Sequence, residues 1–118
     1  MHDHNMEKYT GEWAGTKRHG KGTMLLLCGS VHEGYWMNDK RNGHGRYVHA
    51  DGDYYIGQWN DDCMHGEGTY VHSGGAQYIG QWQMNQHHGQ GSERWEDGAV
   101  YTGTYVDGKK QGYGEFSW

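Results

Sequence analysis

The fold is decided by the stretch Tyr55-Ile-Gly-Gln-Trp59 together with its continuation, Gly66-Glu-Gly-Thr-Tyr70. In both segments every second residue is an aromatic ring or a glycine. A period of two is typical of β-strands, because successive side chains point to opposite faces of a sheet. The polar residues 60–65 suit a turn, and residues 72–75, which include two glycines, suit another. The stretch therefore predicts two short strands joined by turns.

This stretch recurs every 23 residues, which makes the chain an internal repeat. We predict an N-terminal tail over residues 1–8 and an array over 9–118. Its units are 9–31, 32–54, 55–77, 78–100 and 101–118, the last of which is incomplete. The first aromatic position of the units holds Tyr9, His32, Tyr55, Tyr78 and Tyr101, and the second holds Trp13, Trp36, Trp59, Trp82 and Tyr105. A third ring lies in the second predicted strand of three units, at Tyr47, Tyr70 and Phe116.

The short connections fix how the strands pair. A turn of a few residues, such as Asp51-Gly-Asp53, can join only antiparallel neighbours. We therefore predict an all-β protein, built as one elongated antiparallel meander of successive β-hairpins with about ten strands. A glycine inside a strand is unfavourable unless something covers its bare backbone. We expect the rings of each unit to lie on the same face as its glycines and to cover them.

The pattern Tyr-x-Gly-x-Trp followed by His-Gly-x-Gly resembles the MORN repeat (membrane occupation and recognition nexus). Tyr9-Thr-Gly-Glu-Trp13 with Arg18-His-Gly-Lys-Gly22 is similar to the usual wording of that family. The resemblance implies a fold of hairpins and a role in assembly, as in radial spoke heads, junctional membrane proteins and cytoskeletal scaffolds. Such arrays also precede the catalytic parts of some plant lipid kinases and of a lysine methyltransferase. His32 departs from the pattern at a tyrosine position, and Thr16, Asp39, Asp62 and Asn85 depart from it at a turn glycine.

Composition narrows the class of protein. Only 11 of the 118 residues are Leu, Ile, Val or Phe, whereas there are 6 Trp and 10 Tyr, so we expect a thin, aromatic core. A net charge of −5 argues against nucleic acid, whose binding needs a basic stripe. No apolar run approaches the length of a membrane span, and residues 1–5 do not resemble a signal peptide. We expect a cytoplasmic protein, with the cytoskeleton or a cilium as candidate locations.

The ten histidines and two cysteines could suggest a metal site or a disulfide. His19, His65 and His88 occupy one repeat position, and equivalent positions two strands apart are separated by about 9.6 Å. That separation is too large for one shared ion, and the pair His2 and His4 is weaker still. Cys28 and Cys63 fall in turns at opposite ends of the strands, so we predict free thiols. We expect no cofactor and no metal.

Basic residues recur at one repeat position, as Lys17/Arg18, Lys40/Arg41 and Lys109/Lys110. Clusters of Lys and Arg favour anionic membranes. Here the basic line is interrupted in units three and four, and Asp39, Asp62 and Asp107 lie beside it. We therefore interpret these residues as solvated turns.

The function predicted from these features is that of a non-catalytic scaffold. We expect an aromatic stripe to bind a helix or strand of a partner protein. Two alternatives remain open, an anionic-lipid module and a regulatory segment of a larger enzyme. The final segment, Gly114-Glu-Phe-Ser-Trp118, carries no block against edge pairing and predicts self-association. The predicted partner-binding residues are Tyr9, Trp13, Trp36, Tyr47, Tyr55, Trp59, Tyr70, Tyr78, Trp82, Tyr101, Tyr105 and Phe116.

Overall fold

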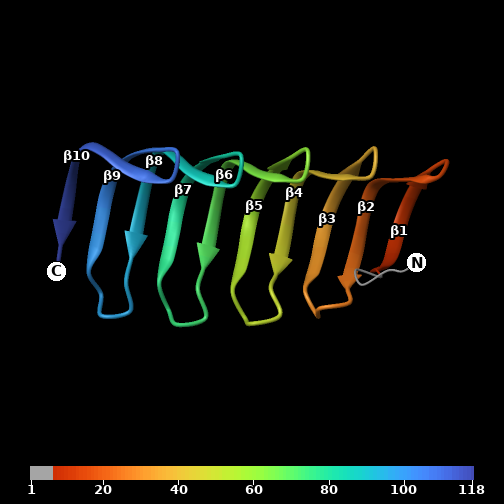
Figure 1. Ribbon diagram of the computed structural model, residues 1–118, viewed down its shortest axis with the longest axis horizontal. Coiled ribbons are helices and arrows are strands. Elements are labelled where there is room, and N and C mark those ends of the chain that lie inside the picture. Colours follow the sequence, from red (N-terminus) through yellow and green to blue (C-terminus); the bar gives the residue numbers. More distant parts are fainter. Residues whose placement is uncertain (1–6) are drawn as a thin grey trace.

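The computed structural model describes residues 7–118, which form one antiparallel sheet of ten strands (Figure 1). The strands follow one another in chain order, and each pairs only with its sequence neighbours, as predicted. Strand β1 begins at Glu7, so it includes the last two residues of the predicted tail. The strands are β1 (Glu7–Ala14), β2 (Lys17–Leu26), β3 (Val31–Met37), β4 (Lys40–Val48), β5 (Tyr54–Asn60), β6 (Cys63–Val71), β7 (Gln77–Gln83), β8 (Gln86–Arg94), β9 (Val100–Val106) and β10 (Lys109–Ser117).

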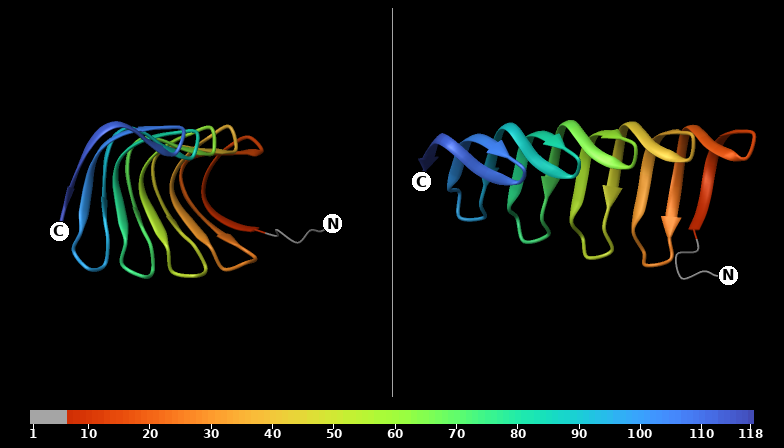
Figure 2. Two further views of the ribbon diagram at one scale, coloured as in Figure 1. Left: turned by 60° about the vertical axis from the view of Figure 1, so that its left-hand side comes forward. Right: turned by 45° about the horizontal axis from the view of Figure 1, so that its top comes forward.

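The sheet is a single curved layer measuring 50 × 24 × 22 Å. All strands bend in the same direction, which gives the sheet a C-shaped cross-section (Figure 2). A single layer has no second sheet to pack against, so side chains are buried only where the concave face gathers them. Residues 7–118 contain no helix that is long and apolar enough to cross a membrane.

A row of ten glycines runs straight across the strands. Each glycine is paired with the next, for example Gly45 with Gly57, Gly57 with Gly68, and Gly68 with Gly80. We call this the glycine row, and its members are Gly11, Gly22, Gly34, Gly45, Gly57, Gly68, Gly80, Gly91, Gly103 and Gly114. It aligns the strand glycines of all five units across the sheet.

Each unit has a β-bulge just past the glycine row. In unit three the register shifts between Gly57 and Trp59, and Gly66 takes a φ of +75°. A Cβ on Gly66 would meet the Gln58 side chain rather than a ring, so the prediction that Gly66 shares a face with Gly68 is wrong. The Gln58 Oε1 atom accepts a hydrogen bond of 3.0 Å from the Glu67 backbone N–H and thereby holds the bulge. The same bond recurs from Lys21 to Glu12 and from Gln90 to Gln81.

The turns inside the units are shorter than predicted. Strand β6 already begins at Cys63, so the turn expected over residues 60–65 contains only Asp61 and Asp62. Both of these residues have positive φ, of 47° and 69°, as a tight two-residue hairpin turn requires. The prediction was too long because polar residues next to a turn also occur on the exposed parts of strands.

These turns also connect consecutive units. The backbone N–H of Asp62 donates to the Arg41 carbonyl at 3.0 Å, and its Oδ1 atom accepts from the Arg41 backbone N–H at 2.8 Å. Asp39 makes the same two bonds with Arg18, and Asn85 makes them with Met64. The acidic or amide residue that replaces the turn glycine therefore clamps its unit onto the preceding one.

We expect Met84→Asn to stabilise the protein. Met84 is exposed and has a φ of +49°, a conformation that costs most side chains about 1 kcal/mol but that asparagine adopts readily. Unit two has Asn38 at this position, with a φ of 50°. Thermal unfolding should show a gain of about 0.5–1 kcal/mol. Met37→Asn, at the exposed last position of β3 just before the equivalent turn of unit two, serves as the control and should give no gain.

Candidate functional site

Interlocked rings form the floor of the concave face. The Tyr55 ring makes an edge-to-face contact with Trp59 of its own unit at 5.2 Å between centroids, and another with Trp82 of the next unit at 5.4 Å. Tyr9 and Tyr78 make the same pair of contacts in their units. Edge-to-face pairs of this kind are favourable by about 0.5–1.5 kcal/mol each. The rings therefore join the units into one continuous core.

The glycine row lies directly beneath these rings. A Cβ on Gly68 would collide with the Tyr55 hydroxyl, and a Cβ on Gly57 would lie 2.7 Å from the same oxygen. The hydroxyl donates a hydrogen bond of 2.9 Å to the Gln58 carbonyl, so the ring lies flat along its own strand. This geometry confirms the prediction that rings cover the strand glycines.

The tryptophan of each unit binds the backbone of the preceding unit. The indole Nε1–H of Trp36 donates to the Gly22 carbonyl at 3.2 Å, that of Trp59 to Gly45 at 3.3 Å, and that of Trp82 to Gly68 at 3.0 Å. In unit five Tyr105 takes this place, and its hydroxyl donates to Glu93 Oε1 at 2.6 Å. Burial, followed by this bond to a carboxylate, raises the pKa of Tyr105 above its ordinary value.

His32 departs from this design. It is 1% exposed and packs between Trp36 and Trp59, but neither ring nitrogen has a hydrogen-bond partner in the structure. Burial, followed by the nearby Arg41 charge, lowers the pKa of His32 to about 3. The position is a weak point of the core, because an imidazole is too short to bind the backbone as the tyrosines do.

A family model described as MORN repeat matches residues 9–26, 32–54, 55–77, 78–100 and 101–118. The chain belongs to the MORN repeat family. No curated protein matches the chain significantly. The MORN repeat is a non-catalytic module that mediates interactions with proteins or membranes. The observed packing gives its signature a physical reason, since the tyrosine needs the glycine beneath it and the tryptophan needs the carbonyl of the preceding unit.

Most of the predicted binding residues are part of the MORN core. Seven of them are at most 7% exposed: Trp36, Tyr55, Trp59, Tyr78, Trp82, Tyr101 and Tyr105. The expected exposed aromatic stripe is thus wrong for these seven, because each is covered by rings of its own unit or of a neighbouring unit. Tyr9, Tyr47 and Tyr70 are half-buried, and Trp13 and Phe116 are 54% and 53% exposed. Of the twelve predicted binding residues, only these five expose part of their rings to solvent.

In units one and two, an arginine side chain lies over the ring floor of the concave face. The Arg18 guanidinium lies over the Trp36 ring at 4.9 Å and pairs with Asp39 at 3.0 Å, and Arg41 lies over Trp59 at 4.7 Å. Both belong to strands, and their side chains are only 20% and 25% exposed, so the interpretation of Arg18 and Arg41 as solvated turn residues is wrong. The 21-residue spacing from each arginine to its partner aspartate, repeated in two consecutive units, was the signal in the sequence that could have revealed these pairs.

The same position changes character towards the C-terminus. It holds Met64 in unit three and His87 in unit four. The His87 ring stacks on Tyr78 at 3.7 Å, and burial lowers its pKa. In unit five the Lys110 ammonium lies 5.1 Å from the Tyr101 ring and 3.2 Å from Glu93 Oε1. At this repeat position, the concave face therefore changes from ion-paired arginines in units one and two to an apolar, an imidazole and a lysine side chain in units three to five.

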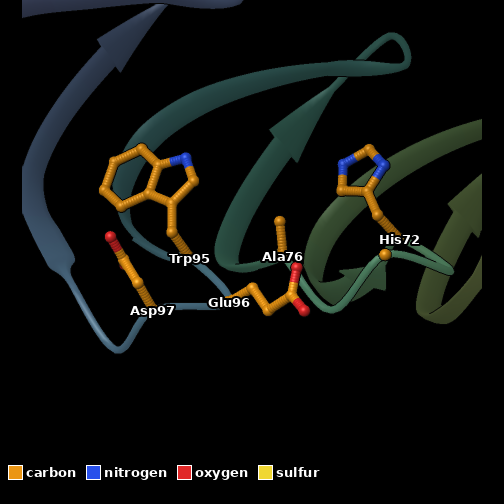
Figure 3. Close-up of a pocket in the computed structure, with 6 residues that line it drawn as sticks. His72, Ala76, Trp95, Glu96 and Asp97 are labelled. Carbon is orange, nitrogen blue, oxygen red and sulfur yellow. The ribbon is translucent and has the colours of Figure 1, made fainter.

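A line of shallow cavities follows the concave face of the MORN array, one after another along the units. One lies between Arg18 and Asp62 beside Tyr47, and the next lies between Tyr47 and Asn85. A further cavity lies beyond them, between the connections that follow β6 and β8 (Figure 3). In Figure 3, Trp95 lies on one side of this cavity and His72 on the other, with Glu96 and Asp97 at its rim. Together these cavities and the five accessible rings form what we call the groove.

The remaining candidates are the cysteines and the histidine clusters, and Cys28 lines the groove cavity beside Tyr47. Cys28 and Cys63 are free thiols. Within residues 7–118 no three His, Cys, Asp or Glu side chains gather as metal ligands. The pair His2 and His4 lies outside the described residues.

Proposed function

We propose that this MORN array is a protein-interaction module that receives a helix or strand of a partner protein in its groove. The observation that carries the proposal is a run of three cavities in which each shares lining residues with the next. The run reaches from Tyr9 in unit one to Asn85 in unit four. The core rings beneath it are fixed by hydrogen bonds and ring contacts, so a partner meets a floor that needs little rearrangement. Such pre-organisation reduces the entropy lost on binding.

The chemistry of the groove suits a peptide better than a small ligand. Its accessible rings, such as Tyr47 and Tyr70, offer apolar anchoring surface. Asp53 accepts hydrogen bonds from the Tyr70 hydroxyl at 3.1 Å and from the Ser73 backbone N–H at 2.8 Å. Rings flanked by polar groups are typical of surfaces that anchor a partner.

An anionic-lipid function is the second candidate, and the ion pairs argue against it. Arg18, Arg41 and Lys110 are each within 3.2 Å of a carboxylate oxygen, so their charges are already balanced. We further propose that the chain is not itself an enzyme and that it acts in the cytoplasm, in a cytoskeletal or ciliary assembly. The packing of seven signature rings into a core, where they serve the fold, supports the first of these statements.

A photo-crosslinking experiment tests the groove. Benzoylphenylalanine replaces Tyr70 in the groove in one variant and Tyr35, which is 48% exposed on the outer face, in a matched control. We expect irradiation in cells to crosslink a partner protein to the Tyr70 variant and not to the Tyr35 variant. Once the partner is identified, Tyr47→Ala should weaken its binding about tenfold or more. Crosslinks from Tyr35 alone would refute the groove proposal. Flotation of the protein with phosphatidylserine vesicles would support the lipid function instead.

We also propose that the protein associates with itself through the β10 edge. This strand pairs with β9 on one side only within the described part of the chain. It carries two exposed rings, Tyr113 and Phe116, and the exposed Trp118 follows it directly. An unpaired edge offers backbone hydrogen bonds to any incoming strand.

A further inference from the structure

The two ends of the sheet are complementary to each other. Among residues 7–118, β1 pairs only with β2, and β10 pairs only with β9. Inside the array, every second strand of a unit meets the first strand of the next unit in one register, in which Gly43 faces Trp59, Gly45 faces Gly57 and Tyr47 faces Tyr55. In the repeat, Gly112, Gly114 and Phe116 of β10 are equivalent to Gly43, Gly45 and Tyr47. Likewise, Trp13, Gly11 and Tyr9 of β1 are equivalent to Trp59, Gly57 and Tyr55.

We propose that copies of the chain stack head to tail, with β10 of one copy pairing with β1 of the next in this register. The proposal rests on the self-association through β10 and specifies its geometry. The sheet then continues across the junction with the same spacing, and the two grooves become one. An end-to-end contact between unlike surfaces leaves one end of each copy free to bind a further copy, so it forms open chains, or rings where the rotation closes, rather than a fixed dimer.

Such a junction would supply a hydrogen-bond acceptor for the indole Nε1–H of Trp13. Trp36, Trp59 and Trp82 each donate Nε1–H to a glycine carbonyl of the preceding unit and are at most 7% exposed. Trp13 is the equivalent residue of unit one, and it is 54% exposed. The glycine at the equivalent acceptor position is Gly114 of the neighbouring copy. Docking therefore buries Trp13 and gives its indole the acceptor that the other three tryptophans have.

Two further contacts would form across the junction. Arg18 and Arg41 lie over the tryptophans of the following units, and Lys110 holds the same position in unit five, so it would lie over the second copy's Trp13. The turn clamp has no counterpart at the junction, because only Gly15 has positive φ in the first turn, whereas both Asn38 and Asp39 do in the second. On the outer face Glu115 lies diagonal to the second copy's Lys8, an opposite-charge pair.

Two end-blocked variants of the 118-residue chain test the geometry. Trp13→Lys blocks the head, because it places an ammonium beside Lys110 of the neighbour, and Phe116→Lys blocks the tail. Ile79→Lys, on the exposed middle strand β7, is the matched control. Sedimentation over a wide concentration range should show growing chains for the native protein and for Ile79→Lys, and monomers for each blocked variant. An equimolar mixture of the blocked variants should form one-to-one dimers, because each supplies the free end that the other lacks.

The outcomes separate the two proposals. A native chain that stays monomeric would overturn both self-association and head-to-tail stacking. Dimers of Trp13→Lys alone would show that β10 pairs with β10, so self-association would stand and the head-to-tail register would fall. Near-ultraviolet circular dichroism checks that the variants are folded. Trp13→Phe, which keeps the ring and removes only the indole donor, should weaken association about fivefold. Unchanged association of Trp13→Phe would contradict the assigned hydrogen bond.

Discussion

Gly68→Val is expected to destabilise the protein by about 3 kcal/mol or more, whereas Thr69→Val should change its stability by less than about 0.5 kcal/mol. A Cβ on Gly68 would collide with the Tyr55 hydroxyl and lie 2.5 Å from Cε1 of the same ring. The ring cannot move aside, because Tyr55 is fully buried between Trp59 and Trp82. Its hydroxyl would also lose the bond to the Gln58 carbonyl.

Thr69 is the matched control because it is the next residue of the same strand. It pairs with Ile56 and Ile79 on the neighbouring strands, and its side chain points to the outer face, away from the rings. Valine has a high strand propensity and suits that surface. Urea unfolding of both variants measures the difference. Equal midpoints for the two would mean that the rings do not need the bare glycine backbone.

His32→Tyr is expected to stabilise the protein and to remove most of its sensitivity to mild acid. The pKa of buried His32 is about 3, against an ordinary value of 6.5, so its neutral form is favoured in the folded state. Above pH 6.5 neither state binds this proton, and His32 causes no pH dependence. As the pH falls below 6.5 the unfolded state becomes protonated first, and stability declines by up to about 1.4 kcal/mol per pH unit. The loss at pH 5 is about 2 kcal/mol.

A tyrosine at this position has its backbone acceptor already in place. In units one, three and four the tyrosine hydroxyl bonds to the carbonyl three residues later, which for position 32 is that of Tyr35. We expect a gain of about 1–2 kcal/mol at pH 7.5 from the ring and its bond. His32→Phe separates the two effects, since it removes the titration but adds no hydroxyl. Unfolding curves at pH 7.5 and pH 5 measure both. A slope unchanged in both variants would place the acid sensitivity elsewhere, with His87 as the next candidate.

The sequence was sufficient to predict the strand order and the ring-over-glycine packing. These follow from one physical constraint, which is that Tyr55 and Gly57 recur together and a ring over a strand needs a residue without a Cβ. The tyrosine and glycine occur together in four of the five units, so this one sequence is enough to reveal the constraint. The fold was therefore predictable because its stabilising contact is local and periodic.

The bulge and the groove were not predictable in the same way. Strict alternation places Gly66 on the face of Gly68, but the bulge turns it towards Gln58. The bulge also brings Arg41 onto the ring face, where it reaches Trp59 and Asp62. Which rings remain accessible depends on how far neighbouring units cover one another. That coverage is a property of the curved sheet rather than of any one unit.

The glycine row makes the stiffness of the sheet depend on direction. Along its length, each unit is tied to the next by a turn clamp, a tryptophan hydrogen bond and ring contacts, so stretching the array breaks several of these at once. Across its width, the glycine row is a line without side chains on either face, where bending is opposed mainly by the backbone and by the tyrosines lying over it. The curved sheet thus has a line of low bending stiffness along the glycine row, at the base of the concave face. Its walls can widen or narrow around objects of different thickness while its length stays constant.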